Sequence, residues 1–77
     1  MLRLKNIKIE SKRAEADFYP EDSNEAGHVV VDLLRGEFIS HTDVIGYGES
    51  YRGHALQRLM QMAKEKDSRT ECLVMWY

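Results

Sequence analysis

The sequence predicts a small α+β domain in which one amphipathic helix packs on one face of a mostly antiparallel sheet of four or five strands. Residues 2–19 alternate apolar and charged side chains around a polar turn, which is typical of a β-hairpin. Residues 50–67 repeat apolar side chains at helical spacing. Residues 72–76 are all apolar, which indicates a further strand. The expected order over the single domain 1–77 is four strands, a helix and a final strand.

The first hairpin is predicted over residues 2–9 and 14–19, with a polar turn at residues 11–13. The apolar phase of its first strand slips by one position near Asn6, and a β-bulge there reconciles the two halves. The apolar positions of the two strands are Leu2, Leu4, Ile7, Ile9, Ala14, Ala16 and Phe18.

Residues 20–27 are polar and contain proline and glycine, so we expect a loop before the second hairpin. The second hairpin spans residues 28–42, with a tight turn at residues 35–36 in which Gly36 supplies the positive φ. Two registers are open. A two-residue loop pairs Leu33 with Phe38, whereas a type I turn with a bulge pairs Val31 with Ile39, which we favour. In either register both faces of this hairpin carry large apolar side chains.

The helix over residues 50–67 has one apolar half and one polar half, which is the pattern of a surface helix with one buried face. The apolar half comprises Tyr51, Ala55, Leu56, Leu59, Met60, Met62 and Ala63. Ser50 is the expected N-cap, and Lys64 and Lys66 suit the negative end of the helix dipole.

The final strand is predicted to be internal to the sheet and parallel to a neighbour, because crossover connections through a helix are right-handed and join parallel strands. Its side chains alternate between two apolar sets, Cys72, Val74 and Trp76 on one side and Leu73, Met75 and Tyr77 on the other. A single helix covers only one of these sets. The uncovered sheet face therefore predicts a homodimer or another protein partner.

Composition bounds the possible functions. With 43% hydrophobic and 31% charged residues the chain has enough apolar content to fold, and its net charge of -2 gives no general attraction to nucleic acid or anionic membranes. The first ten residues are not typical of a secretory signal or a membrane anchor. Together with the single cysteine, this predicts a cytoplasmic location without membrane association.

No residue set predicts catalysis, a metal site or a cofactor. His28, His41 and His54 are evenly spaced, but the helix turns His54 away from the sheet, so the three do not converge. Cys72 lies within an apolar strand and is expected to be an inert core thiol. The element order is similar to the minimal core of ribonuclease-H-like domains and of HicB-like antitoxins by topology alone. The first strand lacks the central aspartate with which such a nuclease would hold its metal.

The function expected from these observations is a small non-catalytic interaction or regulatory module, dimeric through the uncovered sheet face. Its expected contact residues are Trp76, Tyr77, Phe38 and Tyr47. The alternative is a nucleic-acid-binding module that uses the basic first strand and turn. The basic residues of that alternative are Arg3, Lys5, Lys8, Lys12 and Arg13.

Overall fold

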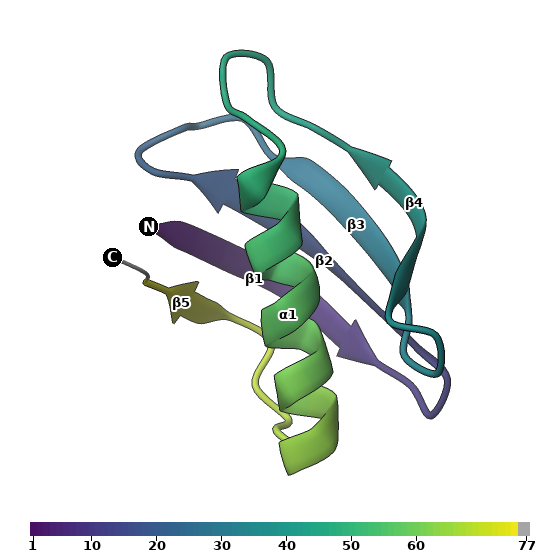
Figure 1. Ribbon diagram of the computed structural model, residues 1–77. Coiled ribbons are helices and arrows are strands. Elements are labelled where there is room, and N and C mark those ends of the chain that lie inside the picture. Colours follow the sequence, from purple (N-terminus) through teal and green to yellow (C-terminus); the bar gives the residue numbers. More distant parts are fainter. Residues whose placement is uncertain (76–77) are drawn as a thin grey trace.

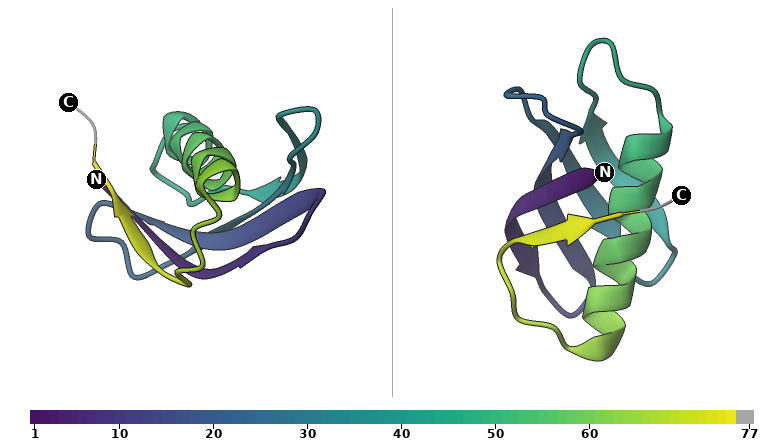
Figure 2. Two further views of the ribbon diagram at one scale, coloured as in Figure 1. Left: turned by 90° about the horizontal axis from the view of Figure 1, so that it is seen from below. Right: turned by 90° about the vertical axis from the view of Figure 1, so that its left-hand side faces the viewer.

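The computed structural model describes residues 1–75 of the chain and confirms the predicted α+β class and element order. Its elements are β1 (Leu2–Ile9), β2 (Arg13–Pro20), β3 (Gly27–Asp32), β4 (Glu37–Thr42), α1 (Ser50–Glu65) and β5 (Cys72–Val74). The strands form one antiparallel sheet in the order β4-β3-β2-β1-β5 (Figure 1). Figure 2 shows α1 lying in the concave face of this curved sheet.

The final strand is at the edge of the sheet and antiparallel to its neighbour, so the prediction of an internal, parallel strand is wrong. β5 pairs only with β1, with Val74 opposite Leu2 and Cys72 opposite Leu4. The reason lies in the connection after α1. Lys66 ends the helix in a left-handed conformation, and the Ile7 N–H donates to the Thr70 carbonyl at 3.0 Å. The chain therefore reaches β1 near the end of that strand, and a strand continuing beside it runs in the opposite direction.

The core lies between α1 and the concave sheet face. The helix buries Ala55, Leu59 and Met62, which are spaced by four and three residues on one side of α1. The sheet contributes the alternate residues that the sequence pattern assigns to one face, together with Val74 from β5. These buried sheet residues are Leu2, Leu4, Ile7, Ala14, Ala16, Phe18, Val29 and Val31.

The bulge predicted at Asn6 is confirmed. Asn6 has a positive φ of 54°, and the pairing of β1 with β2 shifts between Lys5 and Lys8. Because of the extra residue, Ile7 returns to the buried side of the sheet, where it is 5% exposed. Asn6 itself points its amide to Asp17 on the opposite side, and its Nδ2 donates to Oδ2 of that residue at 2.8 Å.

The second hairpin adopts neither of the two predicted registers. Asp32 pairs with Glu37 and Val31 with Phe38 around a four-residue turn at residues 33–36, and a bulge follows at Ile39. The Asp32 carboxylate decides the turn, because its Oδ1 accepts from the backbone N–H groups of residues 34 and 35 at 2.9 and 3.1 Å. The Gly36 N–H then closes the turn on the Asp32 carbonyl at 2.8 Å. Sequence patterning cannot anticipate which acidic side chain accepts these bonds.

The start of the helix also differs from the prediction. Ser50 is the first helical residue, and Glu49 occupies the N-cap position without a side-chain capping hydrogen bond. Glu49 instead places its carboxylate 3.7 Å from the guanidinium of Arg52, one turn into the helix. A carboxylate at this end of α1 interacts favourably with the helix dipole.

Candidate functional site

The convex face of the sheet, which α1 leaves open, is mainly charged. Alternation from the buried positions places every second side chain of β1, β2 and β3 on this face. Among them Val30 is apolar and Tyr19 is aromatic, and β5 adds Leu73 opposite Arg3. The members of this face that carry charged or imidazole side chains are Arg3, Lys5, Lys8, Arg13, Glu15, Asp17, His28 and Asp32. The expected broad apolar sheet face is therefore not found in the described part of the chain. Of the predicted second apolar set, Leu73 lies on this face of β5 and is 50% exposed, whereas Met75 follows β5, is 52% exposed and lines a pocket with His54 and Arg58 of α1.

Two of the predicted nucleic-acid-binding residues gather around one aromatic ring on this face. The Cζ atom of Arg3 and the Nζ atom of Lys5 lie 5.2 and 5.6 Å from the ring centroid of Tyr19. Arg3 also donates from Nη2 to the Ser23 carbonyl at 2.7 Å, which holds its side chain across β2. Lys8 and Arg13 lie on the same face nearer the β1–β2 turn, opposite Glu15 and Asp32 in the strand pairing, and Lys12 is exposed in that turn.

His28 joins two carboxylates beside this group, a contact that sequence reasoning missed. Its Nδ1 lies 2.7 Å from Oδ1 of Asp17, and its Nε2 lies 3.2 Å from Oε2 of Glu15. The hydrogen bond to Asp17 is the main reason that the pKa of His28 is raised above its usual value. The pKa of Asp17 is lowered, first by the hydrogen bond from Asn6 and then by that from His28. The pairing of β2 with β3 places Asp17 opposite His28, so only the register reveals this cluster.

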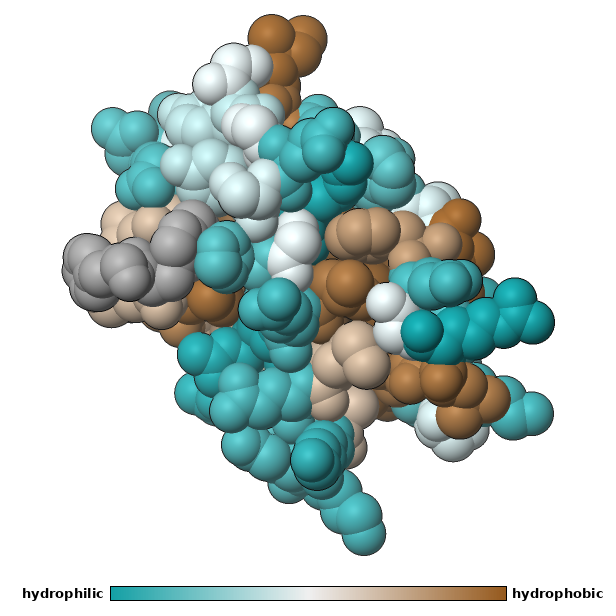
Figure 3. Space-filling view, in the orientation of Figure 1, coloured by the Kyte–Doolittle hydropathy of each residue, from teal (hydrophilic) through white to brown (hydrophobic). Residues whose placement is uncertain are grey.

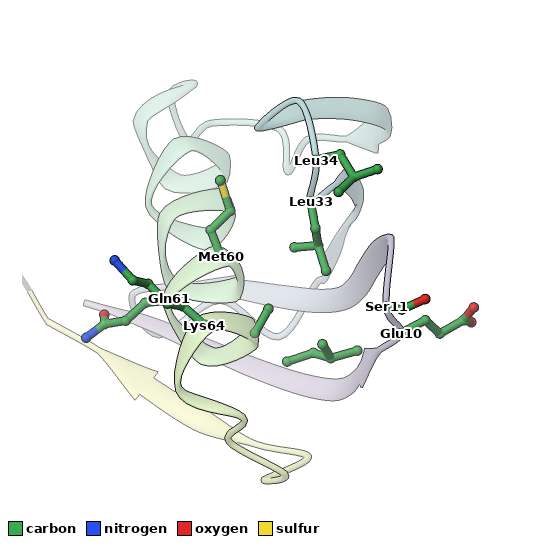
Figure 4. Close-up of a pocket in the computed structure, with 9 residues that line it drawn as sticks. Glu10, Ser11, Leu33, Leu34, Met60, Gln61 and Lys64 are labelled. Carbon is green, nitrogen blue, oxygen red and sulfur yellow. The ribbon is translucent and has the colours of Figure 1, made fainter.

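A groove of about 650 Å³ lies between α1 and the turns that follow β1 and β3 (Figure 4). Its apolar lining comes from Ile9, Leu33, Leu34, Met60 and Ala63. Its polar lining consists of Glu10, Ser11, Gln61 and Lys64. In Figure 4 the two leucines and Glu10 with Ser11 stand on the side of the turns, whereas Met60, Gln61 and Lys64 stand on the side of the helix. We call these two sides the turn bank and the helix bank.

Local backbone contacts explain why two leucines line the turn bank. The Asp32 carboxylate holds residues 33–36 in a turn, so Leu33 and Leu34 leave the sheet and project beside α1. The Leu33 N–H donates to the Lys12 carbonyl at 2.9 Å, which ties the β3–β4 turn to the β1–β2 turn. Leu34 is 75% exposed at the rim of the groove. The sequence does contain a signal for these exposed leucines, because the second hairpin has more large apolar residues than one buried face of two strands can hold.

The surface view places this groove within a wider apolar area. In Figure 3 apolar surface lies beside α1, on the side of β4 and the β3–β4 turn, while polar side chains cover the outward side of the helix. Ile39 on β4 is 55% exposed, and Phe38 packs partly buried against the core. Leu34 and Ile39 are thus the exposed large apolar side chains of β4 and the β3–β4 turn, and Leu73 and Met75 are exposed in and after β5 at the opposite edge of the sheet.

The predicted contact residues have different surroundings. Phe38 lies on the helix side of β4, with the guanidinium of Arg52 5.8 Å from its ring centroid and the His41 ring 5.4 Å away in an edge contact. Tyr47 packs edge-to-face on Tyr51 at 5.6 Å and is partly buried against the core. Trp76 and Tyr77 lie outside the described residues.

The described residues contain few groups suited to catalysis or metal binding. Cys72 is partly buried with its Sγ 3.8 Å from Sδ of Met62, and burial raises the pKa of its thiol. Pairing in the second hairpin puts His28 opposite Thr42 and His41 opposite Val29, hence on opposite faces of the sheet. Within residues 1–75 no three histidine, cysteine or acidic side chains come together in a metal-binding arrangement. Nor is any helix of that part long and apolar enough to cross a membrane.

No protein-family model, curated protein or solved structure matches this chain. Its function is therefore inferred from its own contacts, shapes and charges.

Proposed function

We propose that this protein is a non-catalytic interaction module whose contact surface is the groove between α1 and the two turns. The single observation that carries the proposal is the groove itself, about 650 Å³ in volume, with an apolar lining and the 75% exposed Leu34 at its rim. Binding sites in proteins commonly have volumes of about 300 to 1,000 Å³ and a mostly apolar lining with a few polar groups. The groove meets both criteria.

The shape of the groove favours a protein surface as its occupant. Leu34 projects from the rim, so an occupant has to fill the hollow and also cover this side chain from outside. An apolar side chain on a protein surface fills such a hollow while its surroundings cover the rim, which is the usual arrangement of an interface hot spot.

The convex sheet face is less suited to this role, although it was the surface expected from the sequence. Covering it with a partner removes water from Glu15, Asp17 and His28, and desolvating charged groups opposes binding unless new partners replace the water. We therefore place the contact surface on the flank of the helix.

The described titratable groups support a role without catalysis. Both ring nitrogens of His28 are engaged by carboxylates, so neither is available to activate a nucleophile. The thiol of Cys72, with its raised pKa, has little thiolate at neutral pH. A cytoplasmic location, favoured by the single cysteine, is part of the same proposal.

Selection from a library of displayed peptides on the immobilised chain tests the proposal. We expect enrichment of peptides with apolar anchor residues, whose binding is lost in L34D and retained in I45D. Leu34 and Ile45 are both exposed, at 75% and 94%, so the two variants match in chemistry and differ in position. Enriched peptides that bind L34D as tightly as the original chain would contradict the proposal, and so would a selection that enriches no peptide.

A second candidate function, nucleic-acid binding, is favoured by the grouping of Arg3 and Lys5 around the Tyr19 ring. Aromatic rings beside cations are typical of surfaces that bind single strands. Binding of a single-stranded oligonucleotide measured over a salt series tests this function, since phosphate contacts predict a steep loss of affinity with salt. An affinity independent of salt, or unchanged in Y19L, counts against it.

A further inference from the structure

We propose that the occupant of the groove is a second copy of this chain, bound about a two-fold axis that runs parallel to the groove. In this arrangement the turn bank of each copy lies on the helix bank of the other. The inference rests on the proposed function, because it assumes that the groove is the contact surface. It adds the identity of the partner and the orientation in which that partner binds.

The shape of the patch is self-complementary. One surface carries both a projecting side chain, the 75% exposed Leu34, and a hollow lined by Met60 and Ala63 on the opposite bank. A two-fold interface joins the same patch of both copies. Each contact between a residue of the first copy and a different residue of the second is therefore repeated with the two copies exchanged. Leu34 of each copy then enters the hollow of the other, and both projections are covered at once.

The charges of the two banks select the direction of the axis. Glu10 stands on the turn bank and Lys64 on the helix bank, towards the same end of the groove, while Leu34 and Met60 stand towards the other end (Figure 4). A two-fold axis parallel to the groove places the turn bank of each copy on the helix bank of the other and keeps the same ends of the two grooves together. Glu10 of each copy then faces Lys64 of the other, and Leu34 of each copy faces Met60 of the other. A two-fold axis perpendicular to the groove would place turn bank on turn bank and helix bank on helix bank, so no pair of Glu10 with Lys64 would form.

The contacts of Glu10 within one copy leave it able to make this pair. Its Oε2 lies 4.0 Å from Nε of Arg13, and the two side chains are 65% and 60% exposed. An ion pair this long and this exposed holds a side chain only weakly. Glu10 can therefore turn to Lys64 of a second copy without losing a strong contact.

The size of the chain gives a further reason for a second copy. A domain of about 60 to 80 residues buries only about 60 to 65% of the surface that its unfolded chain exposes, so its own core leaves it marginally stable. Pairing of two copies through an apolar groove extends the buried surface of each. The exposed Ile45, in the loop before α1, lies near the other end of the helix from Lys64 and takes no part in the proposed contact.

Sedimentation equilibrium of the purified chain over about 1 to 500 µM tests the arrangement. We expect a monomer–dimer equilibrium in which L34D raises the dissociation constant at least about tenfold, whereas I45D leaves it unchanged. The charge reversals E10K and K64E should each raise the constant about fivefold, because every substitution acts twice in a two-fold interface. The double variant E10K/K64E should return to within about threefold of the original value. All substituted side chains are exposed or at the rim, and circular dichroism checks that each variant folds.

The other outcomes overturn the inference in distinguishable ways. A chain that stays monomeric over the whole range, yet still binds selected peptides in an L34D-sensitive way, refutes the second copy as occupant and leaves the proposed function standing. A monomer that binds no peptide refutes both. A dimer that dissociates in I45D but not in L34D places the interface elsewhere, and a double charge reversal that fails to restore the dimer refutes the two-fold orientation.

Discussion

Replacing Gly27 by alanine should destabilise the fold, although strand propensity alone predicts the opposite. Gly27 begins β3 opposite the ring of Phe18, and both residues are buried. A Cβ atom at position 27 would lie 2.2 Å from Cζ of Phe18 and 2.5 Å from the Thr42 carbonyl oxygen. Carbon atoms in ordinary contact are about 3.5 to 4.0 Å apart, so the ring or the strands have to move by more than about 1 Å.

The magnitude follows from two opposed terms. Alanine in a strand interior is more favourable than glycine by about 0.5 to 1 kcal/mol, because glycine loses more backbone freedom on folding. Overpacking of a filled core costs about 1 to 3 kcal/mol, and the upper part of that range applies here because one of the contacts is a backbone carbonyl. We expect a net loss of about 2 kcal/mol in the free energy of unfolding, which lowers Tm by about 8 to 16 °C for a domain of this size.

Urea and thermal unfolding followed by circular dichroism, at one fixed chain concentration, measure this loss. G53A is the matched control, since no atom lies within 4 Å of a Cβ added at Gly53 in α1, and we expect it to stabilise the protein by about 0.5 to 1 kcal/mol. In the background of F18L the G27A penalty should shrink by about 1 kcal/mol, because leucine lacks the Cζ and Cε1 ring atoms that the added Cβ would meet. A G27A protein as stable as the original chain refutes the reasoning, as does a penalty that F18L leaves unchanged.

Three further predictions concern the core, the histidine cluster and the thiol. L59A removes a fully buried side chain from the inner side of α1 and should lower the unfolding free energy by about 2 to 5 kcal/mol, whereas L34A at the exposed rim should change it by less than about 0.5 kcal/mol in dilute solution. Urea unfolding compares the two variants, and equal effects would contradict the core assignment. Because the pKa of His28 is raised in the folded state, its contribution to stability is fully present below the unfolded pKa of about 6.5 and is lost as pH rises through the folded pKa. The stability advantage of the original chain over H28Q should therefore shrink as pH rises above about 6.5, and an advantage that is constant or grows with pH rejects the carboxylate contacts as its source. Cys72, whose thiol pKa is raised by burial, should react with iodoacetamide at neutral pH several-fold more slowly than it does in urea, as followed by mass spectrometry, and equal rates would show that the thiol is not protected.

The sequence by itself determined the elements that depend on local periodicity. Alternation of apolar residues predicts the strands of the first hairpin, and the slip of that alternation predicts the bulge that the positive φ of Asn6 confirms. The helical spacing of Ala55, Leu59 and Met62 likewise predicts the buried side of α1. These features are readable because each is set by contacts on one face of one element, and the residues on that face recur at a fixed interval.

Only the tertiary structure decided how the elements meet. The edge position of β5 depends on where the chain leaves α1, and the register of the second hairpin depends on the Asp32 carboxylate. The contact between His28 and Asp17 follows from the pairing of β2 with β3, and the groove beneath Leu34 follows from the β3–β4 turn. The physical reason is that strand order and register are chosen by free energies of contact between segments distant in the chain, and a periodic pattern is compatible with several such pairings.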